Sequence, residues 1–168
     1  MLSSIYQNFL TKDSQFKENY FFSMKTIFLD FDGVLHALAE RVEKKFCRLY
    51  LLEELAVEFS FDIVVSSTWR LFNDVSVLKY QLKSVGERVV GVTGQSISGP
   101  FARHKEILRY VDENKVKEWR ALDDAQMEFP NSETRLISCE TDKGLGKSQI
   151  VLLKKWLAES RKPHDITR

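Results

Sequence analysis

The stretch "KTIFLDFDGVLH", residues 25–36, sets two aspartates one residue apart at the end of an apolar run. The run over 25–30 is rich in strand formers and has no polar face, which is typical of a strand buried on both sides of a sheet. Carboxylates are costly to bury without partners. Asp30 and Asp32 therefore indicate a functional site at the end of this strand.

The rest of the chain alternates between strand-like and helix-like segments. Continuous apolar strands separated by helices indicate parallel pairing, with helices on both faces of the sheet. We therefore expect an α/β fold, a three-layer α/β/α Rossmann-like sandwich with a central parallel sheet. Further strands are expected at 61–67, 88–94, 118–124 and 134–140, and helices at 48–60, at 74–86 up to a stop at Gly86, at 101–114 and at 146–160.

The overall composition excludes several classes of protein. The chain has 168 residues, 43% of them hydrophobic and 29% charged, as expected for one globular domain. A net charge of +1 gives no general electrostatic reason to bind nucleic acid. No stretch approaches the roughly 20 apolar residues of a membrane span, so no membrane partner is expected. The unpaired Cys47 and Cys139 suit the reducing cytoplasm.

Two parts of the chain are expected to differ in organisation. Residues 24–168 carry the alternating pattern and are assigned to the domain. Residues 1–23 form an N-terminal extension whose aromatic residues suit docking on the surface of the domain.

Polar residues gather where the expected strands end. The carboxyl ends of parallel strands meet at one edge of the sheet, where such folds bind their ligands. That edge should therefore collect carboxylates, hydroxyls and, from the start of one helix, cations. The residues are Asp30 and Asp32 after the first strand, Ser66, Ser67 and Thr68 after the second, Arg103 and Lys105 in the helix over 101–114, and Asp123 and Asp124 after the fourth strand.

This set suits phosphoryl transfer to an aspartate. A carboxylate can act as a covalent nucleophile. Converging carboxylates repel one another unless a cation lies among them, and Mg²⁺ prefers such oxygen ligands. A hydroxyl and a cationic side chain can hold the phosphoryl oxygens. Asp32, two residues from the nucleophile, can protonate the leaving oxygen and then deprotonate water.

The order of these groups resembles the haloacid dehalogenase superfamily of aspartate-nucleophile hydrolases. Its DxDG motif matches residues 30–33, its Ser or Thr after an apolar strand matches Ser66 in "DIVVSS", and its acidic pair matches the end of "RALDD". The resemblance covers residues 25–157. A closer likeness is to small bacterial domains associated with RNA repair, the Swiss Army Knife proteins. The shared stretches are "DGVLH", "SSTWR", "RHKEI", "ALDD" and "DKGLGKS".

The resemblance implies roles for individual residues. Asp30 is implied as the nucleophile and a Mg²⁺ ligand, and Asp32 as the acid/base, with its backbone carbonyl on the metal. Asp123 and Asp124 are implied as further metal ligands. The phosphate is implied to bind Ser66 or its neighbour Ser67. An acid at position 32 points to a phosphatase rather than to a dehalogenase.

The same resemblance leaves several alternatives open. Either Arg103 or Lys105 is the cation that contacts phosphate. His36 is a structural or a substrate-facing residue. Trp69 and Arg70 are either a surface helix start or a pocket rim that suits a nucleotide. The protein is a phosphatase, a phosphotransferase or a catalytically silent binding module.

The spacing of the motifs bears on the substrate. The intervals between Asp32 and Ser66 and between Thr68 and Arg103 are too short for a separate cap domain. An open site suits a bulky phosphorylated substrate, such as a nucleic-acid end, a nucleotide or a phosphoprotein. A neighbouring subunit or the N-terminal extension is an alternative cover for the site, and the sequence does not give the oligomeric state.

Overall fold

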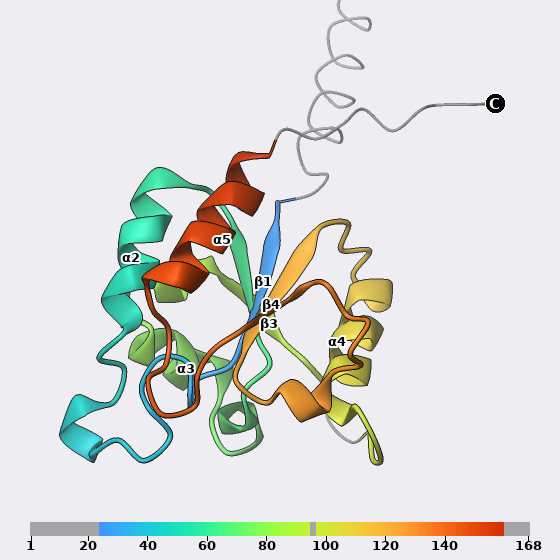
Figure 1. The fold of residues 1–168 in the computed structure, drawn as a ribbon, viewed down its shortest axis with the longest axis horizontal. Helices are drawn as coiled ribbons and strands as arrows, with labels where there is room; N and C mark the ends of the chain where they lie inside the picture. Colours follow the sequence, from blue (N-terminus) through green and yellow to red (C-terminus); the bar gives the residue numbers. More distant parts are fainter. Residues whose placement is uncertain (1–23, 95–96, 160–168) are drawn as a thin grey trace, which may run out of the picture.

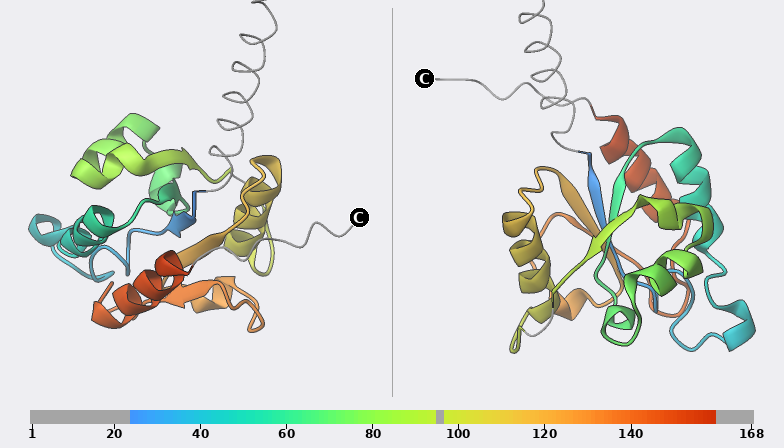
Figure 2. Two further views of the ribbon diagram at one scale, coloured as in Figure 1. Left: turned by 90° about the horizontal axis from the view of Figure 1, so that it is seen from above. Right: turned by 180° about the vertical axis from the view of Figure 1, so that it is seen from behind.

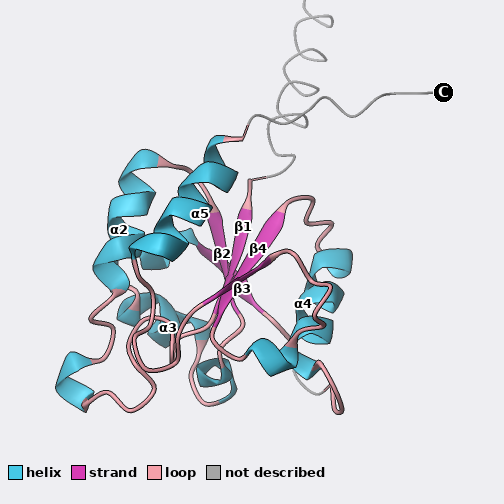
Figure 3. Ribbon diagram, viewed as in Figure 1, coloured by secondary structure: helices cyan, strands magenta, loops and turns pink. Residues whose placement is uncertain are grey.

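The computed structural model describes residues 24–94 and 97–159, and the extension expected at 1–23 lies outside the described residues. The described chain forms one five-stranded parallel sheet with the order β3-β2-β1-β4-β5. Figure 3 shows β1 between β2 and β4. The expected α/β fold with a central parallel sheet is confirmed. The strands are β1 (Thr26–Leu29), β2 (Asp62–Val65), β3 (Val89–Val92), β4 (Trp119–Asp123) and β5 (Leu136–Ser138).

Helices cover both faces of this sheet. The α-helices α2, α3 and α5 lie on one face, and α4 lies on the other (Figures 1 and 2). None of the described helices is long and apolar enough to cross a membrane. The helices are α2 (Leu49–Glu58), α3 (Val75–Gln81), α4 (Ala102–Glu113) and α5 (Lys147–Ala158), with the short 3-10 helices η1 (Val42–Lys44), η2 (Thr68–Leu71), η3 (Lys83–Arg88) and η4 (Gln126–Glu128).

The central strand β1 is apolar because both of its faces are covered. Ile27 and Leu29 pack in the cluster beneath α2, α3 and α5, whereas Phe28 packs against Ile107 of α4. All three β1 side chains are fully buried. Each contributes roughly 1.5–3 kcal/mol through removal from water. This burial fixes the strand that carries Asp30 in the middle of the sheet.

One expected helix ends earlier than the sequence indicates. The helix predicted over 74–86 breaks after α3, because Lys83 takes a positive φ of 50° and starts η3. Gly86 is therefore no helix stop. It lies inside η3, where a Cβ would stand 2.0 Å from the carbonyl oxygen of Lys79. Glycine is needed there because the two backbone segments touch.

The intervals that can carry a cap are used by the domain itself. Between β1 and α2 the described chain holds loops and η1. Between β2 and β3 it holds η2, α3 and η3, and the buried side chains of Leu78, Leu82 and Val85 anchor α3 and η3 to the core. Neither interval carries a separate folded unit.

A buried carboxylate ties the loop before β5 to α4. Glu133 accepts hydrogen bonds from the guanidinium of Arg135 at 2.7 and 2.6 Å and contacts Nε2 of His104 at 2.7 Å. Its side chain is only 5% exposed. Hydrogen bonds from Arg135, assisted by His104, lower the pKa of Glu133 to about 2 although burial opposes this.

Glu133→Gln is expected to lower the free energy of unfolding by about 1–3 kcal/mol at pH 7, since it leaves the guanidinium of Arg135 and Nε2 of His104 without a charged partner. The folded-state pKa lies below the ordinary value of 4.5. The stabilisation by the ionised Glu133 carboxylate is therefore complete above pH 4.5 and is lost as the pH falls towards about 2. Urea unfolding should show the difference between wild type and variant at pH 7 and a smaller difference at pH 3.

The matched control for this prediction is Glu140→Gln. Glu140 pairs with Lys143 at 2.6 Å, but both side chains are exposed, so little change in stability is expected. Two results would contradict a stabilising role for the Glu133 carboxylate. One is an equal loss of unfolding free energy in both variants, and the other is a loss in Glu133→Gln that stays the same size from pH 7 to pH 3.

Candidate active site

The register of the sheet brings three predicted site residues side by side. Leu29 of β1 pairs with Val65 of β2 on one side and with Leu122 of β4 on the other. The residues that follow these three are Asp30, Ser66 and Asp123. The backbone N–H of Ser66 donates a hydrogen bond to the carbonyl oxygen of Leu29 at 2.9 Å. The backbone N–H of Asp30 donates one to the carbonyl oxygen of Leu122 at 3.0 Å.

The position of this trio within the sheet is where α/β folds bind ligands. From β1 the chain continues to β2 and β3 on one side, then crosses to β4 and β5 on the other side. The helix that makes this crossing is α4, on the opposite face from α2 and α3 (Figure 1). A crevice forms at the carboxyl ends of the strands where the order reverses in this way. Asp30 and Asp123 lie on the two strands that flank this point.

Three carboxylates converge at this edge. Asp30, Asp123 and Asp124 each offer an oxygen, and these oxygens lie within 4.8 Å of one another. Gly33 makes room for the third acid, because with its φ of 72° a Cβ there would stand 2.2 Å from Oδ2 of Asp124. The glycine of the DxDG motif thus lets Asp124 approach. The side chain of Asp32 is not part of this carboxylate cluster.

Arg103 is the cation beside these acids. Its Nη1 lies 2.7 Å from Oδ2 of Asp123 and 3.2 Å from Oδ1 of Asp30. Burial opposes the charge of Arg103, but the carboxylates of Asp123 and Asp30 outweigh burial and raise its pKa above the ordinary value. Lys105 is exposed on α4 and makes no ion pair with the acids in the described part of the chain.

The cluster remains short of positive charge. Burial, and then the negative charge of Asp30, raise the pKa of Asp123 to about 6, although Arg103 opposes the shift. Three carboxylates and one guanidinium leave a net charge of −2 when all are ionised. The same negative surroundings, after burial, raise the pKa of the Cys139 thiol to about 12, so Cys139 is a protonated core residue.

Two buried hydroxyls near the ends of β2 and β3 lack partners. Oγ of Ser66 and Oγ1 of Thr93 make no hydrogen bond with any described residue. Ser67, by contrast, is occupied: its Oγ accepts a hydrogen bond from the N–H of Trp69 at 3.4 Å and caps η2. An unsatisfied buried hydroxyl is costly, so Ser66 and Thr93 are available to a ligand. Thr93 was not predicted, although it lies in an expected strand end, at 88–94.

Asp32 lies apart from the other acids, beside a cavity. Its Oδ1 lies 3.0 Å from Nε2 of His36, and its Oδ2 accepts a hydrogen bond from Nε1 of Trp69 at 2.7 Å. The cavity has a volume of about 360 Å³, and Thr68, Phe72 and other residues of the same segment line it. Phe72 is 84% exposed at this cavity, so its ring is accessible to a ligand.

Arg70, in the short helix η2, has a buried side chain that binds neighbouring backbone, whereas its neighbour Trp69 lines the cavity beside Asp32. Arg70 donates to the carbonyl oxygens of Ser66 and Ser67 at 2.7 Å each and to that of Thr93 at 3.1 Å. It also pairs with Glu106 of α4 at 2.5 Å. One residue of "SSTWR" and one of "RHKEI" thus form an ion pair that joins α4 to the ends of β2 and β3.

The stretch "DKGLGKS" supports the loop that follows β1. Gly144 has a φ of 70°, and a Cβ on it would stand 2.7 Å from the carbonyl oxygen of Val34. The same oxygen accepts a hydrogen bond from the N–H of Leu145 at 2.7 Å. The late glycine thus allows two backbones to touch, and the contact holds the "DGVLH" loop in place.

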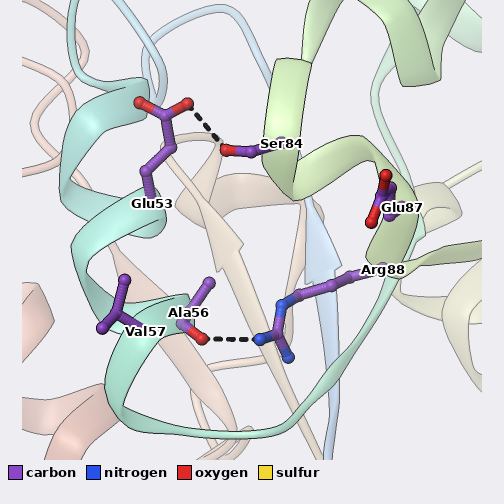
Figure 4. A pocket seen from close by; sticks show the side chains of 6 residues that line it. All are labelled: Glu53, Ala56, Val57, Ser84, Glu87 and Arg88. Atoms are coloured by element: carbon purple, nitrogen blue, oxygen red, sulfur yellow. Dashed lines mark hydrogen bonds between the residues drawn. The ribbon is translucent and has the colours of Figure 1, made fainter.

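A second cavity, of about 430 Å³, lies between α2 and η3 (Figure 4). Its polar groups are largely paired with each other: Arg88 donates to the carbonyl oxygen of Ala56 at 2.6 Å, and Ser84 donates to Glu53 at 2.9 Å. None of the predicted site residues lines this cavity. It is therefore not the candidate active site.

Comparison with known proteins identifies the family. The family model described as "HAD domain in Swiss Army Knife RNA repair proteins" matches residues 26–150, which include every described strand and all the acids of the site. No curated protein and no solved structure matches the chain. The chain belongs to this family of HAD domains, as its acidic strand ends and parallel sheet predict.

Proposed function

We propose that this protein is a Mg²⁺-dependent phosphatase that hydrolyses a phosphomonoester through an aspartyl-phosphate on Asp30. The family is one of phosphohydrolase-type domains, which supports the reaction class. The observation that carries the proposal is the convergence of Asp30, Asp123 and Asp124 within 4.8 Å, with Arg103 paired to two of them. The unpaired cysteines suit the cytoplasm as the compartment.

The donor set fits a divalent cation. All three side chains are carboxylates, and Mg²⁺ takes oxygen ligands, typically one or two carboxylates together with substrate phosphate. The net charge of −2 that remains after pairing with Arg103 matches the charge of such an ion. We propose that Asp30, Asp123 and Asp124 hold it with their side chains, and Asp32 with its backbone carbonyl. When bound, the ion would neutralise charge on the phosphoryl oxygens.

The side chains of Asp30 and Asp32 carry out the bond-making and proton-transfer steps of the proposed reaction. The carboxylate of Asp30 attacks phosphorus as the bond to the leaving oxygen breaks, and Asp32 gives its proton to that oxygen. Asp32, now a carboxylate, takes a proton from water as the water oxygen bonds to phosphorus and the bond to Asp30 breaks. Arg103 and the free hydroxyl of Ser66 hold the phosphoryl oxygens where charge is spread.

The position of Asp32 also indicates where the leaving group binds. The group that receives the proton must lie within hydrogen-bond reach of Asp32. The cavity of about 360 Å³ beside Asp32 is therefore the proposed site of the leaving group. Its accessible Phe72 ring suits stacking on a planar base. The RNA-repair context of the family supports a phosphorylated nucleic-acid end or nucleotide as substrate.

The purified protein is expected to hydrolyse p-nitrophenyl phosphate with Mg²⁺ and to stop when EDTA removes the metal. Asp30→Asn should reduce turnover to the level of buffer. Asp32→Asn should lower turnover by about 10²–10⁴-fold, because general acid–base catalysis contributes a factor of that size. Rapid acid quenching of Asp32→Asn should trap phosphate on the peptide that contains Asp30, detectable by mass spectrometry.

The matched control is Asp74→Asn. Asp74 precedes α3, makes no side-chain capping bond and is exposed, so full activity is expected. Retained turnover in folded Asp30→Asn would refute the covalent step. Absence of turnover in the wild type on every phosphomonoester tried would favour a silent binding module, and transfer of phosphate to an alcohol in preference to water would favour a phosphotransferase.

The proposal assigns the phosphate-binding cation to Arg103. Arg103→Ala should lower kcat/KM by about 10²–10³-fold, the usual effect of removing one donor from a developing oxyanion. Arg103→Lys should recover part of this loss, which separates lost charge from misfolding. Lys105→Ala should leave kcat/KM essentially unchanged, because Lys105 is exposed. A large loss for Lys105→Ala with a small one for Arg103→Ala would reverse the assignment.

The substrate is tested through Phe72. A screen should compare 3′- and 5′-phosphorylated oligonucleotides, mononucleotides and glycerol phosphate. Phe72→Ala should raise KM for the base-containing substrates by about tenfold, since stacking on one base is worth about 1–3 kcal/mol. KM for glycerol phosphate should not change, because it has no base to stack. Equal effects on all substrates would contradict a stacking role for Phe72.

A further inference from the structure

The carboxylate of Asp32 has a donor on each of its oxygens. Nε2 of His36 lies 3.0 Å from Oδ1, and Nε1 of Trp69 lies 2.7 Å from Oδ2. The Asp32 side chain is still 29% exposed. Its orientation is therefore set from behind by two protein groups, while part of its surface stays open towards the cavity.

The hydrogen bonds of His36 indicate which ring nitrogen carries the proton. The backbone N–H of Phe46 donates to Nδ1 at 3.4 Å, so Nδ1 is an acceptor. Nε2 then carries the hydrogen and donates it to Asp32. In this arrangement His36 is a neutral donor. It supplies no proton to the reaction, and the same holds for the indole N–H of Trp69.

Packing holds both donors in position. His36 is fully buried, and its ring centroid lies 5.5 Å from that of Phe46 and 6.5 Å from that of Trp69. Phe46 and Phe31 contact the Trp69 ring edge-on at 5.4 and 5.8 Å. Four rings thus form one cluster with little freedom to rotate. The donors are fixed before any substrate arrives.

We propose that His36 and Trp69 are positioning residues that hold Asp32 in the orientation from which it exchanges protons with the leaving oxygen and with water. This inference rests on the proposed function. His36 does not line the cavity proposed for the leaving group, whereas Trp69 lines it and also donates its N–H to Asp32. Their effect is transmitted through the direction of one carboxylate, and proton transfer depends steeply on that geometry.

A comparison of two leaving groups separates positioning from a structural role. Nitrophenolate is a weakly basic leaving group that departs with little help from an acid, whereas the alkoxide of glycerol phosphate needs a proton. Trp69→Phe keeps an aromatic ring in the cluster and removes the indole N–H. It should lower kcat/KM for glycerol phosphate about tenfold more than for p-nitrophenyl phosphate, a part of the 10²–10⁴-fold effect of a general acid.

His36 gives a second pair of variants. His36→Gln keeps an amide N–H near the place of Nε2 and should retain most of the activity on glycerol phosphate. His36→Leu removes the donor and should show the same selective loss as Trp69→Phe. The control is Trp119→Phe, the same chemical change in the core beneath α4, which should lower stability and leave the ratio of the two substrates unaltered.

The contact itself can be observed without turnover. The Trp69 indole N–H signal, identified by its loss in Trp69→Phe, should move in Asp32→Asn, and so should the Nε2–H signal of His36 in ¹⁵N-resolved NMR. Asparagine has one acceptor oxygen, so one of the two donors must lose its partner. Signals that stay in place would overturn the proposed contact.

The outcomes distinguish this inference from the proposed function. Equal losses on both substrates in Trp69→Phe and His36→Leu would overturn positioning and leave the phosphatase standing. A wild type that turns over no phosphomonoester, the phosphorylated oligonucleotides and nucleotides included, would overturn both, even if the NMR signals respond to Asp32, because the hydrogen bonds would then be structural only. Selective losses together with responsive signals would support positioning.

Discussion

Repulsion between buried carboxylates is the constraint on which this structure depends. Asp30 and Asp123 extend two neighbouring strands, so the sheet that places them also forces their charges together. Arg103 offsets part of that repulsion from the first turn of α4, while burial, and then the charge of Asp30, still raise the pKa of Asp123 to about 6. A fold that keeps such an edge without a further cation loses stability, because like charges in a poorly hydrated place oppose folding.

The surrounding structure is arranged around that edge. Arg103 reaches the acids only if α4 keeps its position, and the ion pair of Arg70 with Glu106 ties α4 to the carbonyl groups that end β2 and β3. That contact orders the backbone of Ser66 while leaving its hydroxyl free. Asp32 is separated from the acids and is held by aromatic residues, so the two aspartates of one short motif occupy different environments.

Much of this could be predicted from the sequence. Apolar runs mark the five strands, although the edge strands β3 and β5 are only partly buried, and the strand-end rule marks Asp30, Ser66 and Asp123. The order of the strands could not be predicted, since each run is compatible with several neighbours. The sequence therefore did not show that the strands ending at Ser66 and Asp123 lie on either side of the strand that ends before Asp30. Residues 103 and 105 lie about 200° apart around a helix, so only one can face the acids, but which one depends on how α4 packs. Arg70 also binds the carbonyl oxygen of Thr93 on another strand end, and Gly86 touches the backbone of Lys79, and no local pattern reveals either contact.

The backbone contact between Gly144 and Val34 has a consequence for how small a domain of this family can be. The turn before α5 contacts the backbone of the loop that carries the DxDG motif, although more than a hundred positions separate the two along the chain. A trimmed version ending at β5 would retain every acid and the whole sheet, yet it would leave that loop without its support. A shortened version of this domain must therefore keep α5 and its glycine turn.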